Sequence, residues 1–218
     1  MSVLVRSADS NDAVAIATLD NGKANALTLA MIETLAAQVD AIGNDGALVI
    51  EGGSEMFTGG LDLAVLGAGG ESASNLMAAM GRLLTRILDA PRPVVVAADG
   101  HAVAAGAMLM LVADRTLVGD GRASIGFAEV ANGLPLPSGA VELVRHRVAP
   151  QHVLGLTAHA ALVDPQQAVA CGLADELVAP GDVTLRAVEV AAQLAALPAE
   201  PYAATKRVVN GPLLAAMR

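Results

Sequence analysis

The segment Pro93–Ala113 is the most apolar stretch of this 218-residue chain, and it restricts most strongly what the chain can fold into. Asp99 and His101 interrupt it, so its longest uncharged run is Ala102–Ala113. That run is well short of the ~20 residues that a membrane-spanning helix needs. The segment therefore predicts a buried strand, a turn at Asp99-Gly100, and a helix that is apolar on nearly every face and lies inside the protein.

The composition bounds the class of protein. Hydrophobic residues make up 54% of the chain but aromatic residues only 1%, so small aliphatic side chains and methionine must fill the core of what is expected to be one ordinary domain. A net charge of -9 argues against a general surface for nucleic acids or anionic membranes, while a local basic pocket for a phosphorylated ligand remains compatible with it. The single cysteine, Cys171, excludes an intrachain disulfide, and the first residues do not resemble a secretion signal, so a cytoplasmic location is expected.

Periodicity predicts strands and helices that alternate along most of the chain, which indicates an α/β fold with a helical C-terminal region. The predicted strands are Val3–Val5, Val14–Leu19, Ala47–Ile50, Val94–Ala98, Arg115–Val118, Ala123–Phe127 and Leu177–Val178. The predicted helices are Thr28–Gly43, Asn75–Leu88, Ala104–Val112, Ser138–Arg147, Pro150–Leu156, Pro165–Ala170 and Leu185–Leu197. This pattern alone does not fix the topology.

Several segments carry motifs that occur together in one known family. They are LDNGKANALT at Leu19–Thr28, FTGGLDL at Phe57–Leu63, DGHAVAAGAMLMLVAD at Asp99–Asp114, IGFAEVANGLPLP at Ile125–Pro137 and, as a softer match, LVDPQQAVACGLADELVAP at Leu162–Pro180. In order and approximate spacing they resemble the enoyl-CoA hydratase/isomerase (crotonase) superfamily. The resemblance implies a crotonase-like (ClpP/crotonase) spiral of ββα units, with a core over residues 1–180 and a C-terminal helical region over 181–218 that is shorter than in many relatives.

The resemblance implies an oxyanion hole made of two backbone N–H groups, those of Leu61 and Ala105, aimed at a thioester oxygen. Gly59 and Gly60 keep bulky side chains away from the first donor. Ala105 stands where the family usually has a glycine, at the start of the buried helix, and a helix N-terminus favours an enolate oxygen.

The resemblance also implies that Glu129 is the catalytic glutamate. Its neighbours Phe127, Ala128 and Val130 are apolar, so its carboxylate should be partly desolvated and its pKa raised, as a general base working near neutrality requires. Hydratases of the family use a second glutamate on the buried helix, where this chain has Met108. Because a thioether neither orients water nor moves a proton, the single glutamate favours isomerisation of 3-enoyl-CoA to 2-enoyl-CoA in fatty acid metabolism.

Two alternatives remain open. The chain could be an enoyl-CoA hydratase with a non-standard second acid/base, or a homologue that binds acyl-CoA with weak catalysis, because a fold does not prove a reaction. A serine hydrolase is disfavoured, since Ser138 lacks a G-x-S-x-G setting. No ligand cluster with recognisable spacing indicates a metal site.

The same resemblance indicates the partners. Lys23 and the backbone near Ala24 are candidate CoA contacts because the family's early loop lies along the CoA adenine and ribose. Gly60 is a further candidate CoA contact, and Lys206 resembles a family lysine near the CoA phosphates. Coenzyme A is part of the acyl-CoA substrate, so no separate cofactor is expected. The family usually forms trimers or pairs of trimers, and the apolar excess is compatible with a homotrimer or hexamer.

Overall fold

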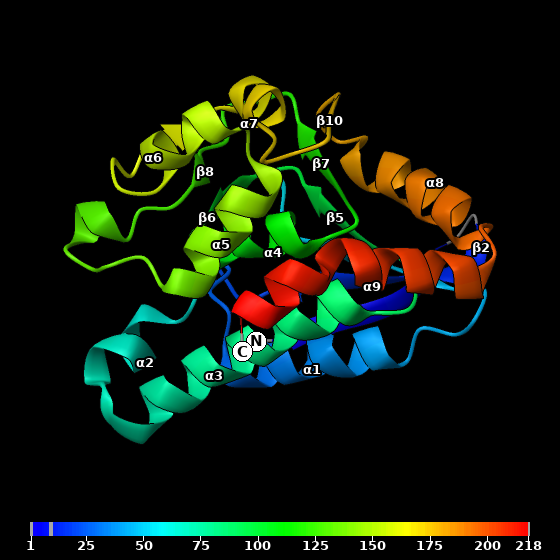
Figure 1. Cartoon of the computed structure of the whole chain (residues 1–218), viewed down its shortest axis with the longest axis horizontal. Coiled ribbons are helices and arrows are strands. Elements are labelled where there is room, and N and C mark those ends of the chain that lie inside the picture. The colour runs from blue at the N-terminus through cyan, green and yellow to red at the C-terminus, as the bar shows by residue number, and fades with distance from the viewer. Residues whose placement is uncertain (1, 9–10, 218) are drawn as a thin grey trace.

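The computed structural model describes residues 2–8 and 11–217 and has a mixed α/β architecture with a helical C-terminal region (Figure 1). The strands are β1 (Ser2–Ala8), β2 (Asn11–Asp20), β3 (Ala47–Glu51), β4 (Met56–Thr58), β5 (Val94–Ala98), β6 (His101–Val103), β7 (Arg115–Gly119), β8 (Ile125–Gly126), β9 (Leu162–Val163) and β10 (Glu176–Val178). The helices are α1 (Leu29–Asp40), α2 (Leu63–Ala68), α3 (Gly70–Asp89), α4 (Ala105–Val112), α5 (Ser138–Arg147), α6 (Val153–Leu156), α7 (Pro165–Cys171), α8 (Val183–Ala195) and α9 (Ala199–Ala216), with 3-10 turns η1 (Val130–Asn132) and η2 (Pro150–His152).

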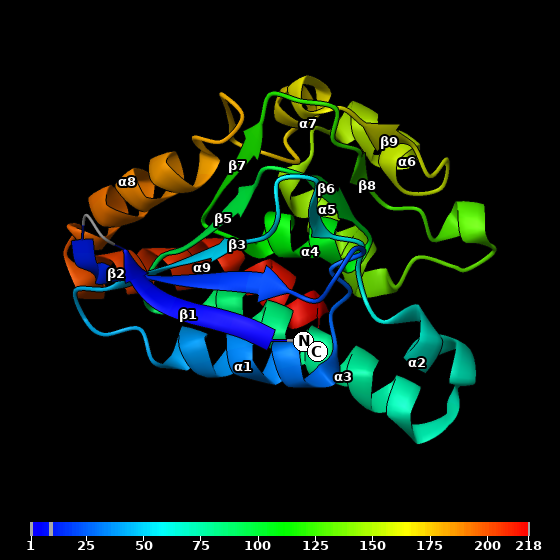
Figure 2. The same ribbon diagram turned by 180° about the vertical axis from the view of Figure 1, so that it is seen from behind.

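The larger sheet has six strands in the order β1-β2-β3-β5-β7-β10. β1 and β2 form an antiparallel hairpin, and every further pair in this sheet is parallel (Figure 2). Parallel neighbours require crossover connections, and the helices between the strands supply them.

Alternate residues of the larger sheet belong to two separate hydrophobic cores. In β3, Leu48 and Ile50 pack into the core that α1, α3 and α4 cover, whereas Ala47 and Val49 pack with α8 on the other face. Both faces of a parallel sheet are therefore covered, which explains why β3 and β5 read as continuous apolar runs.

The smaller sheet has the order β4-β6-β8-β9 and carries the segments that the family motifs single out. β4, β6 and β8 are parallel to one another, and β9 pairs antiparallel with β8. Since the carboxyl ends of parallel strands lie at one edge of a sheet, the segments that follow β4, β6 and β8 meet there.

Local side-chain and backbone signals set several helix ends. The Thr28 hydroxyl caps α1 by accepting from the Met31 N–H. In α7, Asp164 and Gln167 form a capping box, and Gly172 ends the helix in the left-handed conformation with φ 93°.

Other boundaries differ from the sequence prediction. α3 begins at Gly70, five residues before the predicted start. The apolar pattern does not reveal this first turn because its residues are mostly polar and exposed. The strand expected at Ala123–Phe127 is reduced to β8, and α2 is a short helix that the pattern did not predict.

The C-terminal helices pack on the rest of the chain. α8 covers one face of the larger sheet, and α9 packs against α3 and α5. The division into regions 1–180 and 181–218 stays a prediction. No helix within the described part of the chain is long and apolar enough to cross a membrane.

Candidate active site

The segment after β4 presents the amide of Leu61 in a fixed position. The Leu27 N–H donates to the Gly60 carbonyl at 2.8 Å, and the Asp62 N–H donates to the Leu27 carbonyl at 3.1 Å. These two bonds hold the peptide groups on either side of Leu61, whose own N–H has no acceptor among the described residues.

Gly60 brings this segment against the start of α4. Its φ of 101° is one that side chains rarely allow. A Cβ built on Gly60 would lie 3.0 Å from the Cβ of Ala104 and 3.3 Å from the amide nitrogen of Ala105. The amides of Leu61 and Ala105 therefore belong to backbone segments in direct contact, and only glycine fits between them.

The start of α4 is held in an unusual backbone conformation. Ala104 precedes the helix with φ 54° and ψ -116°, and its N–H donates to the Gly126 carbonyl at 2.9 Å. Such a conformation in a residue with a side chain costs about 1–3 kcal/mol and concentrates at functional sites. It places the Ala105 N–H, which has no acceptor among the described residues, at the positive end of a wholly buried helix.

Glu129 follows β8 and begins the turn η1. Its backbone carbonyl accepts from the N–H groups of Asn132 and Leu134, which fixes the turn. Its side chain is half-buried, and its Oε2 atom is fully buried without any hydrogen-bond partner in the described structure. Desolvation raises the pKa of Glu129, an effect that backbone hydrogen bonds from Glu129 and Ala128 offset only in part.

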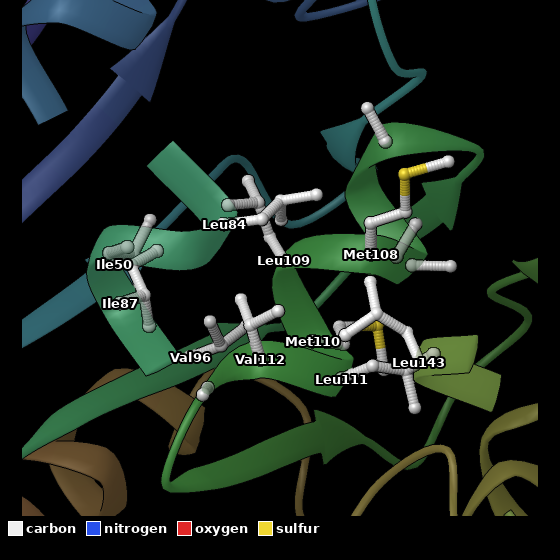
Figure 3. Close-up of a cluster of buried hydrophobic side chains, with 14 of the residues drawn as sticks. Ile50, Leu84, Ile87, Val96, Met108, Leu109, Met110, Leu111, Val112 and Leu143 are labelled. Carbon is white, nitrogen blue, oxygen red and sulfur yellow. The ribbon is translucent and has the colours of Figure 1, made fainter. Parts of the chain in front are cut away.

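The assignment of Met108 to the position of the family's second glutamate stays a prediction, and the structure shows where this side chain lies. Met108 lies one turn beyond Ala105, on the same side of α4. Its 9% exposure is the largest among the buried side chains of this helix, so the thioether borders accessible space. In Figure 3, Leu109 meets Leu84 in the core, whereas the Met108 side chain extends away from that contact.

Asn25, to which the sequence motifs assign no role in the site, supports the loop that contains Lys23 and Ala24. It is 4% exposed and has a positive φ of 46°. Its Nδ2 donates to the carbonyls of Leu19 and Phe57, which ties the loop to β4. The sequence signal that could have indicated this role is the position of Asn25 shortly before a helix, in a motif that also contains Asn21.

Lys23 and Ala24 lie next to the Leu61 segment, since the Ala24 carbonyl accepts from the Gly59 N–H at 2.9 Å. Both residues border a cavity of about 910 Å³. The structure thus brings these two candidate CoA contacts and Gly60 into one region.

Lys206 lies on α9 in a different environment. Its ammonium is 2.7 Å from the Asp114 carboxylate, with side-chain exposures of 7% and 12%. Burial lowers the pKa of Lys206, and the charge of Asp114 opposes that effect. Lys206 borders a separate cavity of about 530 Å³ together with Tyr202, and its contact with CoA stays a prediction.

The candidate site contains backbone donors and one carboxylate. No group of three or more His, Cys, Asp or Glu side chains that could hold a metal ion occurs in residues 2–8 and 11–217. Paired amides of this kind can stabilise an oxyanion, and a desolvated carboxylate can move a proton.

The fold and these segments define a crotonase-fold protein. The chain matches the Enoyl-CoA hydratase/isomerase family over residues 9–216 and belongs to that family. It is 32% identical over 203 residues to a probable enoyl-CoA hydratase, EchA14, of Mycobacterium tuberculosis, a match that covers 90% of this chain and 78% of the relative.

Solved structures agree on the fold. An enoyl-CoA hydratase/isomerase family protein from Pseudomonas syringae has a TM-score of 0.93 at 34% identity, covering 99% of this chain and 93% of that one. An enoyl-CoA isomerase of M. tuberculosis gives a TM-score of 0.91 at 34% identity, covering 99% and 94%. The relatives thus include proteins named for hydration and proteins named for isomerisation.

Proposed function

We propose that this protein is an enoyl-CoA isomerase that converts 3-enoyl-CoA to 2-enoyl-CoA with Glu129 as its single acid/base. The observation that carries the proposal is the buried, unpartnered Oε2 of Glu129, together with Met108 where a second carboxylate would stand. A buried carboxylate oxygen without a hydrogen-bond partner lowers the stability of the folded protein. Such an oxygen is expected at a catalytic site, where the carboxylate accepts a proton from the substrate.

The reaction needs one proton in transit. Glu129 removes a proton from C2 of the 3-enoyl thioester, and the electron pair of that C–H bond moves into an enolate whose negative charge rests on the thioester oxygen. The N–H groups of Leu61 and Ala105 stabilise that oxygen. Protonated Glu129 then delivers the proton to C4, the double bond forms between C2 and C3, and the carboxylate is regenerated.

Met108 makes hydration the less favoured reaction. Adding water to a 2-enoyl thioester requires that a water be oriented and that protons move to carbon and from water, work that two carboxylates share in the family's hydratases. The thioether of Met108 supplies neither function.

The deciding experiment offers the protein both 3-enoyl-CoA and 2-enoyl-CoA. We expect conversion of the first to the conjugated 2-enoyl thioester, followed by its ultraviolet absorbance, and loss of that conversion in Glu129→Gln. Efficient formation of 3-hydroxyacyl-CoA from the second substrate would instead establish a hydratase with another acid/base. Tight binding without turnover of either substrate would establish an acyl-CoA-binding homologue.

We propose further that the chain acts as a homotrimer or hexamer in the cytoplasm, with CoA entering only as part of the substrate. Exposed apolar side chains on α9, among them Val208 at 78% and Val209 at 58% exposure, support an oligomer because subunit contacts would cover them. A monodisperse monomer in light scattering would contradict this oligomeric state.

A further inference from the structure

Thr58, the last residue of β4, contacts both backbone segments that carry the proposed oxyanion donors. Its side chain is 0% exposed. The motif at Phe57–Leu63 gives roles to Leu61 and to two glycines, but none to this hydroxyl. A hydroxyl that is buried so completely needs a hydrogen-bond partner, and the identity of that partner indicates what the side chain does.

The hydroxyl of Thr58 holds the first donor segment. Its Oγ1 accepts from the Gly60 N–H at 3.1 Å, in a bond between two buried residues. On the other side of Gly60, the carbonyl accepts from the Leu27 N–H at 2.8 Å. Because glycine has little intrinsic preference for one backbone conformation, these two bonds together maintain the φ of 101° at Gly60.

The same two bonds fix the direction of the Leu61 N–H. In a trans peptide group the C=O and N–H bonds point in opposite directions. Since the Gly60 carbonyl points to Leu27, the N–H of Leu61 in the same peptide group points away from Leu27. A rotation at Gly60 that turned this N–H would have to break the bond to Leu27 or the bond to Thr58.

The rest of Thr58 packs on the second donor segment. A Cβ built on Gly106 would lie 2.7 Å from the Thr58 carbonyl oxygen and 2.9 Å from the Thr58 Cγ2 methyl. Gly106 directly follows Ala105, and Thr58 is also the strand partner of Ala102 in β6. One side chain therefore binds the Leu61 segment through its hydroxyl and contacts the Ala105 segment through its methyl.

We propose that Thr58 is a positioning residue that fixes the separation and the direction of the Leu61 and Ala105 N–H groups. The inference rests on the proposed acyl-CoA function, because those two N–H groups act on the thioester oxygen. Thr58 acts through them and does not itself touch the substrate. Both donors must be aimed at the oxygen of the transition state, so a small change in their separation lowers kcat more than it changes substrate affinity.

Two substitutions separate the hydroxyl from the methyl group. Thr58→Val keeps the shape of the side chain but leaves the buried Gly60 N–H without its acceptor. We expect its kcat to fall about thirtyfold, with KM within about twofold of the wild type. Thr58→Ser keeps the acceptor and loses only the methyl, so its kcat should stay within about threefold of the wild type, and Thr58→Cys, with a weak acceptor, should lie between the two.

Thr116→Val is the matched control. Thr116 is likewise 0% exposed, and its hydroxyl donates to the Met110 carbonyl at 2.7 Å, in the part of α4 far from Ala105. Losing this hydrogen bond should lower the melting temperature, as the loss at Thr58 does, but leave kcat unchanged.

The carbonyl frequency of a bound thioester reports on the two N–H groups directly and needs no turnover. The probe is butanoyl-CoA labelled with ¹³C at the thioester carbon, followed by difference infrared spectroscopy. Hydrogen bonds to the oxygen weaken the C=O bond, so binding to the wild type should lower the frequency. We expect Thr58→Val to lose part of this shift, and Thr58→Ser and Thr116→Val to retain it.

A wild-type kcat together with a wild-type frequency shift in Thr58→Val would overturn the inference and leave the isomerase intact. An equal loss of kcat in Thr58→Val and in either Thr58→Ser or Thr116→Val would overturn it too, since the hydroxyl acceptor would then not be the cause.

The wild type separates this inference from the proposed reaction. If it turned over no enoyl thioester but shifted the probe in a way that depends on Thr58, the isomerase would be refuted and the positioning role supported. No shift of the bound probe in the wild type would refute the oxyanion hole itself, and the positioning role with it.

Discussion

Asp114 and Glu129 are both carboxylates withdrawn from solvent, but their surroundings are opposite. Asp114 accepts from the Lys206 ammonium at 2.7 Å and from the Val94 N–H at 2.8 Å, so its charge is compensated inside the protein. Glu129 has a buried oxygen with no hydrogen-bond partner among the residues that the structure describes, and desolvation raises its pKa. Burial alone therefore does not mark a reactive carboxylate, and the proposed role of Glu129 depends on burial without a compensating partner.

The two regions also differ in what fixes them. The Asp114–Lys206 pair joins the start of β7 to α9 and thus holds together segments far apart in sequence. Glu129 is held by its own turn, through backbone bonds from Asn132 and Leu134. Loss of the Asp114 carboxylate should therefore lower the stability of the fold, and loss of the Glu129 carboxylate should lower the catalytic rate.

The largest expected effect is that of Glu129→Gln on isomerisation. Removing the only acid/base should lower kcat by about 10³-fold, within the range for general acid/base catalysis. The control is Glu71→Gln, which changes an exposed glutamate in the first turn of α3. Comparable kcat values for the two variants would show that Glu129 is not the acid/base of the reaction.

Gly60→Ala should have the next largest effect. Its Cβ would press on Ala104 and on the Ala105 amide at a φ that alanine tolerates poorly, so the two donors should separate. Losing one oxyanion donor costs about 2.7–4 kcal/mol of barrier, or about 10²–10³ in kcat. Gly81→Ala, at a helical position with open space, is the control, and equal rates for both variants would contradict the proposed hole.

Lys206→Met tests the paired region. Leaving Asp114 buried without its cation should reduce the free energy of unfolding by about 3 kcal/mol, measured by urea denaturation, with KM for acyl-CoA unchanged. The double variant Lys206→Met/Asp114→Asn should recover part of the loss, because no unpaired charge remains. A raised KM at unchanged stability would instead support the predicted CoA contact of Lys206.

The pH dependence should show the smallest effect. As the pH falls, kcat should decline through the pKa of Glu129, which lies above the ordinary glutamate value of about 4.3. The folded carboxyl holds its proton more tightly than the unfolded one, so stability falls as pH rises between the two pKa values. Glu129→Gln should therefore melt above the wild type at neutral pH and at the same temperature as the wild type in acid, where both side chains are neutral. A lower melting temperature of the variant at pH 7 would contradict the desolvated carboxylate.

The sequence could predict elements wherever an apolar pattern matched the period of one element. β3, β5 and α4 lie where their apolar runs indicated. A continuous apolar run predicts an element that is buried on all sides, whichever other elements pack against it. α9 had no predicted bounds, because it contains Pro201 and Pro212 and exposes Val208 and Val209 instead of forming a clear apolar stripe.

For the candidate site, the motifs by themselves determined which residues to consider. Leu61, Ala105 and Glu129 could be named because short segments of glycine, alanine and one glutamate match a family pattern in order and spacing. Only the tertiary structure decided that β4, β6 and β8 run parallel, so that the segments after them meet at one edge.

The tertiary structure alone also distinguished the two lysines. The sequence alone does not separate Lys23 from Lys206. In residues 2–8 and 11–217, Lys23 borders a cavity without an ion-pair partner, whereas Lys206 is buried against Asp114. The physical reason is that a charge takes its role from the groups that surround it in space, and those come from segments that local sequence patterns do not connect.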